Sequence, residues 1–224
     1  SLTLPKLDES WLQAFSDSLR EASEFFNVSL IGGDTTKGPL NITITIMGTV
    51  KKSKAIKRSG AKNGDDIYVS GDLGRAALCL KKINEGSQPS TTELNKLNKP
   101  VPRLSLGSAL KNIASSCIDI SDGLEQDLSH ILSASKVGAI IDSNNLPLSD
   151  TVKEYIKSTQ DWGLPLCGGD DYELCFTSDK SNQSEIKKLS ENLKVRITKI
   201  GVINNSLNLN IKGYDGLSKS FKHF

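Results

Sequence analysis

The chain has 224 residues, of which 37% are hydrophobic and 24% are charged, and its formal net charge at pH 7 is +2. This length suits one large or two small domains, with a core that needs no disulfide or metal to hold it. The nearly balanced charge excludes a strong electrostatic case for nucleic acid or an anionic membrane. No apolar run approaches the about 20 residues of a membrane-spanning helix.

The first fifty residues are predicted to form a helix packed on a hairpin. Residues 11–26 carry apolar side chains at spacings of three and four, which is typical of an amphipathic helix. Residues 28–31 form a short apolar segment, and residues 41–50 alternate isoleucine with polar side chains, as a half-buried strand does. Residues 32–39 between them are glycine-rich and polar, and we expect a loop there.

Residues 51–64 form a basic, glycine-containing connector, and we place a domain boundary between residues 57 and 58. Composition favours a solvated linker over a binding role for this run. Beyond it, the pattern predicts strands at residues 66–70, 117–120, 139–142, 172–177, 195–203 and 207–211. Helices are predicted at residues 73–85, 91–98, 103–114, 123–135, 151–157 and 184–193. This alternation predicts an α/β fold in which helices are layered on a sheet.

The four cysteines do not have the spacing of a zinc site, and the chain has only two histidines. We therefore expect buried, reduced thiols in a cytoplasmic protein. The cysteines are Cys79, Cys117, Cys167 and Cys175.

Three acidic clusters stand beside glycines where a predicted strand meets a loop: residues 32–36, 119–123 and 168–173. Glycine allows the backbone to approach a ligand closely, and aspartate offers the oxygen ligands that Mg²⁺ takes together with substrate phosphates. Three such clusters in one chain favour polyphosphate and metal binding. The chain has neither a Walker loop nor a Rossmann fingerprint, so a nucleotide site of either type is excluded.

The middle cluster allows two interpretations. In an extended segment Asp119 and Ser121 share one face, while Ile120 points into the sheet. Asp122 then precedes a helix, where its carboxylate either caps backbone amides or remains available to a metal. Asp119 likewise is either a metal ligand or an ordinary turn residue. No arrangement of serine or cysteine with histidine suggests a covalent nucleophile.

In these segments the sequence resembles the thiamine-monophosphate kinase family. Residues 30–40 resemble its Gly-Gly-Asp-Thr-Thr-(Arg/Lys)-Gly signature, and residues 57–65 its Arg-x-Gly-Ala-x-x-Gly-Asp segment. Residues 119–124 and 168–174 match two further blocks in order, and residues 221–224 resemble the family's aromatic-x-His-Phe ending. Four blocks in order are specific, whereas any one alone is not.

The resemblance implies a two-domain fold like that of aminoimidazole ribonucleotide synthetase. Residues 1–57 would be the remainder of an N-terminal domain for ATP binding and dimerisation, and residues 58–224 a C-terminal α/β sandwich. The implied reaction is Mg²⁺-assisted, direct in-line transfer of the γ-phosphoryl group of ATP to thiamine monophosphate. The implied protein is a cytoplasmic homodimer with no nucleic-acid or membrane partner.

The resemblance also implies roles for individual residues. Gly33, Asp34, Arg58 and Ser121 would bind ATP. Asp34, Asp119 and Asp122 would bind Mg²⁺. Asp170, Asp171, Tyr172 and Phe221 would contact the thiamine substrate, with Phe221 stacked on its rings. No covalent catalytic residue is implied.

The chain departs from the family at its start, where members carry a further N-terminal third. We therefore expect an incomplete N-terminal sheet and little or no kinase activity of this chain alone. The alternatives are a sister enzyme of the superfamily, such as selenophosphate synthetase or a hydrogenase-maturation ATPase, or a non-catalytic nucleotide-binding domain. The ending Lys222-His223-Phe224 disfavours the hydrogenase type, which normally ends in cysteine. The clustered carboxylates argue against a non-catalytic domain.

Overall fold

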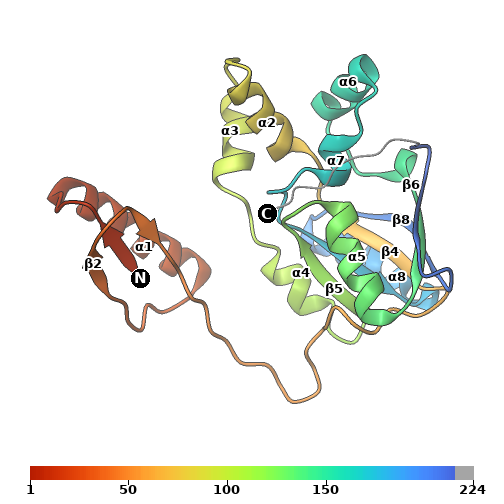
Figure 1. Cartoon of the computed structure of the whole chain (residues 1–224). Coiled ribbons are helices and arrows are strands. Elements are labelled where there is room, and N and C mark those ends of the chain that lie inside the picture. The colour runs from red at the N-terminus through yellow and green to blue at the C-terminus, as the bar shows by residue number, and fades with distance from the viewer. Residues whose placement is uncertain (215–224) are drawn as a thin grey trace. The chain divides into compact units, whose positions relative to one another are not determined.

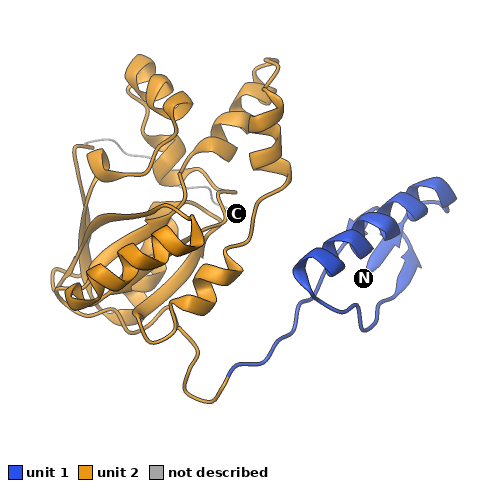
Figure 2. Ribbon diagram, turned by 180° about the vertical axis from the view of Figure 1, so that it is seen from behind, with its two compact units in different colours: residues 1–50 blue, residues 51–224 orange. Residues whose placement is uncertain are grey.

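A computed structural model describes residues 1–214 and divides into two compact units, residues 1–50 and the chain from residue 51 onward (Figures 1 and 2). Residues 51–57, which we expected to close the first domain, belong to the second unit. Cys117 donates its amide to the Lys57 carbonyl at 3.0 Å, and the Lys54 ammonium donates to the Asn112 side chain at 3.1 Å. None of the described helices is long and apolar enough to cross a membrane.

The first unit consists of three short strands and one helix. Strand β1 (Leu2–Leu4) lies in the centre, parallel to β2 (Thr35–Lys37) and antiparallel to β3 (Asn41–Ile42). Helix α1 (Glu9–Phe26) confirms the helix predicted at residues 11–26. Asp8 is its N-cap, and the Asp8 side chain accepts the Trp11 amide at 3.1 Å.

The hairpin predicted for this unit is wrong. Residues 28–31 are irregular, and Thr35–Lys37, expected in a loop, form a strand beside β1. The strand expected at residues 41–50 is limited to Asn41–Ile42, because β1 offers a partner only that far; Thr43 still donates to the Ser1 carbonyl at 2.9 Å. Further along, Ile44 and Ile46 are 64% and 75% exposed.

The second unit is built on a six-stranded sheet with the order β5-β7-β4-β8-β6-β9. All neighbours are antiparallel except β6 and β9, which are parallel. The strands are β4 (Asp66–Ser70), β5 (Ala114–Ile120), β6 (Gly138–Asp142), β7 (Glu173–Ser178), β8 (Ile197–Asn204) and β9 (Leu209–Lys212).

Helices cover both faces of this sheet (Figure 1). They are α2 (Arg75–Asn84), α3 (Thr91–Asn98), α4 (Leu104–Ala109), α5 (Leu124–Ser135), α6 (Asp150–Thr159), α7 (Gly163–Cys167) and α8 (Gln183–Leu193). Ile67 and Val69 of β4 pack with α5, α6 and α7 in one core, while Tyr68 between them packs with α4 and α8 in the other. This alternation follows from the two-residue period of a strand and confirms the predicted α/β layering.

Two helices differ from the prediction for local reasons. Helix α4 ends at Ala109 instead of residue 114, and Asn112 follows with a φ of +71°, which asparagine tolerates better than most residues. Helix α7 was not predicted, because it spans only five residues and contains a glycine and a proline. None of the four cysteines forms a disulfide within the described residues; Cys79, Cys167 and Cys175 are buried as expected, and Cys117 is half-buried.

Candidate functional site

The turn from β5 into α5 carries the first acidic pair. Asp119 is exposed at the end of β5, while Ile120 is fully buried, as the alternation predicted. Gly123, with a φ of +114°, begins α5 and provides no side-chain cap. Within residues 1–214, the carboxylate of Asp122 accepts a hydrogen bond only from the Gln126 side-chain amide, at 3.1 Å. The interpretation of Asp122 as a helix cap is therefore wrong.

Asp127 caps this turn instead, and we did not single it out from the sequence. Its buried Oδ2 accepts the backbone amides of Ser121 and Asp122, both at 3.0 Å. Burial raises the pKa of Asp127, while the two amide donors act in the opposite direction. An acidic residue in the first turn of a helix was the available signal. Because Asp127 satisfies these amides, the carboxylates of Asp119 and Asp122 are left for other partners.

The loop of residues 168–172 packs against this turn through backbone hydrogen bonds. Asp170 donates its amide to the Ser121 carbonyl at 2.9 Å, and Tyr172 donates to the Ile120 carbonyl at 2.8 Å. A Cβ at Gly169 would overlap the Ser121 carbonyl oxygen, so the close approach requires glycine. Two of the predicted acidic clusters are thereby brought together.

Asp170 and Tyr172 both have positive φ values, +66° and +49°. The Tyr172 hydroxyl donates to Asp170 Oδ1 at 3.1 Å. Partial burial raises the pKa of Tyr172, and the negative charges of Asp170, Asp119 and Asp122 raise it further. The negative charges of all three carboxylates therefore act on the Tyr172 hydroxyl.

Asp171 lies on the other side of this loop. It is buried, and both of its carboxylate oxygens accept the Gly74 amide, at 3.1 and 2.9 Å. Burial raises the pKa of Asp171 to about 8, although the Gly74 amide and the charge of Lys96 act in the opposite direction. Asp171 thus connects the acidic loop to the start of α2.

Glu173 anchors the same loop at the start of β7. Its buried carboxylate accepts two hydrogen bonds from Arg103, each 2.6 Å long, one from Lys96 at 3.0 Å and one from Ser70 at 2.7 Å. A buried charge is tolerated only with such partners. These contacts hold α3 and the start of α4 against the strand that carries the site.

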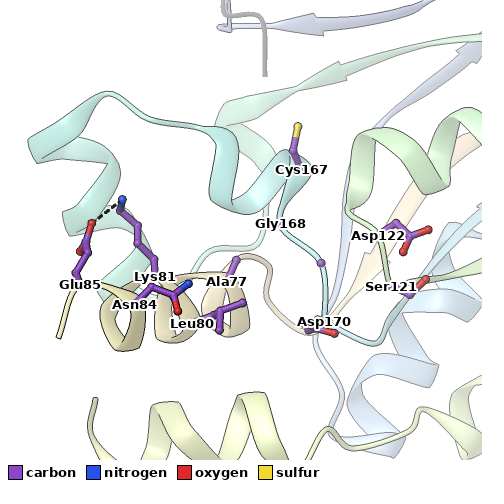
Figure 3. A pocket seen from close by; sticks show the side chains of 11 residues that line it. Ala77, Leu80, Lys81, Asn84, Glu85, Ser121, Asp122, Cys167, Gly168 and Asp170 are labelled. Carbon is purple, nitrogen blue, oxygen red and sulfur yellow. Dashed lines mark ion pairs between the residues drawn. The ribbon is translucent and has the colours of Figure 1, made fainter. Parts of the chain in front are cut away.

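A pocket with a volume of about 680 Å³ opens between this acidic junction and α2 (Figure 3). Ser121, Asp122 and Asp170 line it, whereas Asp119, Asp171 and Tyr172 are not among its lining residues. Helix α2, to which we gave no functional role from the sequence, supplies one side of the pocket. The lining residues are Ala77, Leu80, Lys81, Asn84, Glu85, Ser121, Asp122, Cys167, Gly168, Gly169 and Asp170.

The remaining predicted residues lie elsewhere. Gly33 and Asp34 belong to the first unit, where the Asp34 carboxylate accepts the Thr35 amide at 2.8 Å. Arg58, in the second unit, is exposed, and its carbonyl accepts the Ser135 hydroxyl at 3.3 Å. Within residues 1–214 its guanidinium has no ion pair. Phe221 lies outside the described residues.

The carboxylates of this site suit Mg²⁺ only if a bound substrate supplies further oxygen ligands. In the described part of the chain, no three histidine, cysteine, aspartate or glutamate side chains are grouped closely enough to hold a metal. Mg²⁺ commonly takes only one or two carboxylates and completes its octahedron with substrate phosphates and water. Asp119 and Asp122, which are not needed for capping, meet that requirement.

Two family models match the chain. "AIR synthase related protein, N-terminal domain" covers residues 1–50, and "AIR synthase related protein, C-terminal domain" covers residues 62–212. The second match alone spans more than half of the chain. Each range falls within one of the two compact units.

The chain is also similar to curated proteins named thiamine-monophosphate kinase. It is 44% identical over 206 residues to that of Salmonella typhimurium, covering 90% of this chain and 63% of the relative. It is 42% identical over 237 residues to that of Buchnera aphidicola subsp. Schizaphis graminum, covering 100% of this chain and 72% of the relative. The chain therefore spans less than two thirds of the Salmonella protein.

Solved structures agree with these matches. The thiamine-monophosphate kinase of Stenotrophomonas maltophilia superposes with a TM-score of 0.89 at 37% identity, covering 96% of this chain and 71% of that one. AaThiL complexed with AMPPCP and TMP superposes with a TM-score of 0.81 at 26% identity, covering 100% and 72%. The chain therefore belongs to the AIR synthase related family and, within it, to the family of thiamine-monophosphate kinases.

Proposed function

We propose that the protein containing this chain transfers the γ-phosphoryl group of ATP to the phosphate of thiamine monophosphate, giving thiamine diphosphate and ADP. The observation that carries the proposal is the junction of the β5–α5 turn with the loop of residues 168–172. It gathers Asp122 and Asp170 at one end of a pocket, with Asp119 beside them. The reaction itself is inferred from membership of the thiamine-monophosphate kinase family, and the carboxylates at this junction suit it.

The charge of the junction supports a metal-dependent reaction. Carboxylates at this junction would repel the phosphates of ATP and of the acceptor unless cations lay between them. We assign Asp119 and Asp122 to Mg²⁺. The role of Asp34, in the first unit, as a metal ligand stays a prediction. The ion, when bound, neutralises phosphate charge and orients the phosphoryl group.

The chain's own groups then bind and position the two substrates. Arg58 is assigned to a nucleotide phosphate and Ser121 to the nucleotide beside Asp122, while the role of Gly33, in the first unit, stays a prediction. An oxygen of the acceptor phosphate forms the new bond to the γ-phosphorus while the bond to the bridging oxygen breaks and ADP leaves. That oxygen is already ionised near neutral pH, so no general base and no phosphorylated side chain are required.

On the acceptor side, Asp170 is the substrate contact that the pocket supports best. Its carboxylate lines the pocket and suits the positive thiazolium ring, while the Tyr172 hydroxyl fixes its orientation. Asp171 acts behind it as a positioning residue through Gly74. Stacking of the substrate rings on Phe221 stays a prediction.

The proposal includes a homodimer in the cytoplasm. The exposed isoleucines of residues 41–50 support association, since a soluble monomer rarely leaves a run of apolar side chains uncovered. The near-neutral charge and the reduced state of the cysteines are consistent with a cytoplasmic setting.

Calorimetry on the 224-residue chain with ATP and Mg²⁺ and, separately, with thiamine monophosphate tests the proposal. We expect both to bind, and the ATP signal to disappear when EDTA removes Mg²⁺. In the full-length protein, chromatography should show thiamine diphosphate forming without a phosphorylated protein intermediate. Failure of thiamine compounds to bind, or ping-pong kinetics, contradicts the proposal.

A further inference from the structure

One face of α2 forms a wall of the pocket that the proposed function does not use. Ala77, Leu80, Lys81, Asn84 and Glu85 all line the pocket, and their spacings of three and four place them on one side of the helix. Figure 3 shows these side chains on the opposite side of the pocket from Ser121, Asp122 and Asp170.

The chemistry of this wall differs from that of the acidic junction. Ala77 and Leu80 are apolar, and Leu80 is 43% exposed although it is a large hydrophobic side chain. Lys81 is paired with Glu85 at 2.8 Å, so their charges offset each other. Asn84 is exposed and offers both a donor and an acceptor. A phosphate finds no unpaired cation here, whereas a flat ring with polar edges finds an apolar surface and an amide.

The wall is held at a fixed distance from Asp170. Gly74, at the start of α2, donates its amide to the buried carboxylate of Asp171, the residue next to Asp170. At the other side of the pocket Gly168 packs so closely on Ala77 that a Cβ at position 168 would overlap the alanine methyl group. The helix and the acidic loop therefore form one rigid cleft rather than two independent surfaces.

We propose that Ala77, Leu80 and Asn84 form the subsite for the ring portion of the acceptor, a cationic nitrogen heterocycle carrying a phosphate. The thiazolium ring, which carries the positive charge, faces Asp170. The aminopyrimidine ring lies on Leu80 and Ala77, and its amino group and a ring nitrogen bond to Asn84. This inference rests on the proposed function and divides its pocket into a ring end at α2 and a phosphate end at Asp122. Ala77 and Leu80 then act as specificity residues.

Two matched substitutions on one helix test the subsite. Leu80→Ala removes apolar surface from the pocket, whereas Ile83→Ala removes a similarly exposed side chain, 42% against 43%, that does not line it. Calorimetry measures the dissociation constants of thiamine, thiamine monophosphate and ATP with Mg²⁺ for each chain. We expect Leu80→Ala to weaken thiamine and thiamine monophosphate equally, by about tenfold, as expected for the loss of the apolar contact of between one and two carbon groups. Ile83→Ala should bind all three ligands as the unmodified chain does.

Asn84→Ala provides a second test that does not depend on apolar packing, and its exposed position should leave folding intact. It should weaken both thiamine compounds while ATP binding is unchanged. If the unmodified chain binds thiamine and both substitutions leave its affinity unchanged, the subsite is wrong and the proposed function stands. Weaker binding of ATP instead assigns the wall to the nucleotide and overturns the inference. Failure of the unmodified chain to bind either thiamine compound overturns the proposed function and this inference together.

Discussion

At the β5–α5 turn two aspartates five residues apart have different physical tasks. Asp127 is buried and accepts two backbone amides, so it maintains the turn. Asp122 lines the pocket, and its hydrogen-bond partner in the described part of the chain is the Gln126 side chain. Their substitution should therefore separate ligand binding from stability.

Asp122→Asn preserves the size of the side chain and removes a charged oxygen ligand. We expect the Mg²⁺-dependent affinity for ATP to fall at least about tenfold, since a charge-assisted contact of this kind contributes about 1.5–3 kcal/mol. The midpoint of thermal unfolding should not change, because no backbone group depends on this carboxylate. Calorimetry and a thermal melt on the same preparation measure the two quantities, and a lower melting temperature would support the discarded capping role.

Asp127→Ala should have the opposite signature. It leaves the amides of Ser121 and Asp122 without an acceptor, and we expect the free energy of unfolding to fall by about 1–3 kcal/mol. Asp127→Asn is the matched control, because its amide oxygen still accepts these donors, and its loss should be smaller. Urea unfolding followed by circular dichroism measures both; equal losses for the two variants would contradict the role of Asp127 as an acceptor.

Asp171 makes stability depend on pH in an unusual direction. Its pKa is about 8 in the folded chain, against an ordinary value of 3.8, so between these values the folded state binds the extra proton. The contribution of Asp171 to the free energy of unfolding is therefore largest below about pH 4. It falls as the pH rises toward 8, by at most about 1.4 kcal/mol per pH unit. Asp171→Asn keeps an acceptor for Gly74 and removes this contribution.

Urea unfolding of the unmodified chain and of Asp171→Asn from pH 5 to 8 tests this assignment. Glu93 does not interfere in this range: the hydrogen bond from Lys82 lowers its pKa to about 2, so its contribution is lost only under more acidic conditions. We expect the free energy of unfolding of Asp171→Asn, relative to that of the unmodified chain, to increase with pH. Parallel stability curves would show that Asp171 is ionised throughout and that burial does not control its charge.

Among the elements, the contact between the turn and the loop of residues 168–172 is the one that builds the site. Gly169→Ala places a methyl group against the Ser121 carbonyl and should lower the free energy of unfolding by more than about 1 kcal/mol and weaken thiamine monophosphate binding. Gly107→Ala in α4 is the control: its Cβ meets only Leu174 at an ordinary 3.8 Å, so it should be neutral or stabilising by up to about 1 kcal/mol. Calorimetry and urea unfolding compare the two variants. Similar effects of the two substitutions would contradict the conclusion that position 169 requires glycine.

Several elements were predictable because their determinants are local. Strand β4 and helix α3 have the predicted bounds: β4 is a fully buried run, and α3 starts with a capping box between Ser90 and Glu93. The strands of the first unit were not predictable, because a segment becomes a strand only where a second segment pairs with it. Ile44 and Ile46 belong to a segment that alternates apolar and polar residues as a strand does, but no strand among the described residues pairs with it.

The site shows the same division. Asp119, Asp122 and Asp170 were identifiable because each lies where a predicted strand meets a loop, in a recognisable block that contains glycine. The roles of Asp127 and of the α2 face were not, because they depend on which segments meet after folding. Asp171 was grouped with Asp170 as a substrate contact, but adjacent residues in this loop point to opposite sides, one to the pocket and one to Gly74.

At the scale of the whole molecule, the two units differ in how much apolar surface each buries. The second unit has two cores, one on each face of its sheet. In the first unit only Leu2 and Leu4 are buried, and α1 contributes no buried side chain. Most helical stability in proteins comes from packing, so α1 alone should be marginal.

Hydrogen exchange of the 224-residue chain measures this difference directly. At low protein concentration we expect the amides of α1 and of residues 41–50 to exchange much faster than those of β4 and β7, whose strands lie within the sheet between the two cores. If the first unit carries the dimer contact that we propose, its protection should increase as the concentration is raised, while that of the second unit should not. The β4 amides are the internal reference. Protection of α1 that equals that of β4 and does not depend on concentration would show that the unit is stable alone, and the exposed isoleucines would then no longer support the dimer.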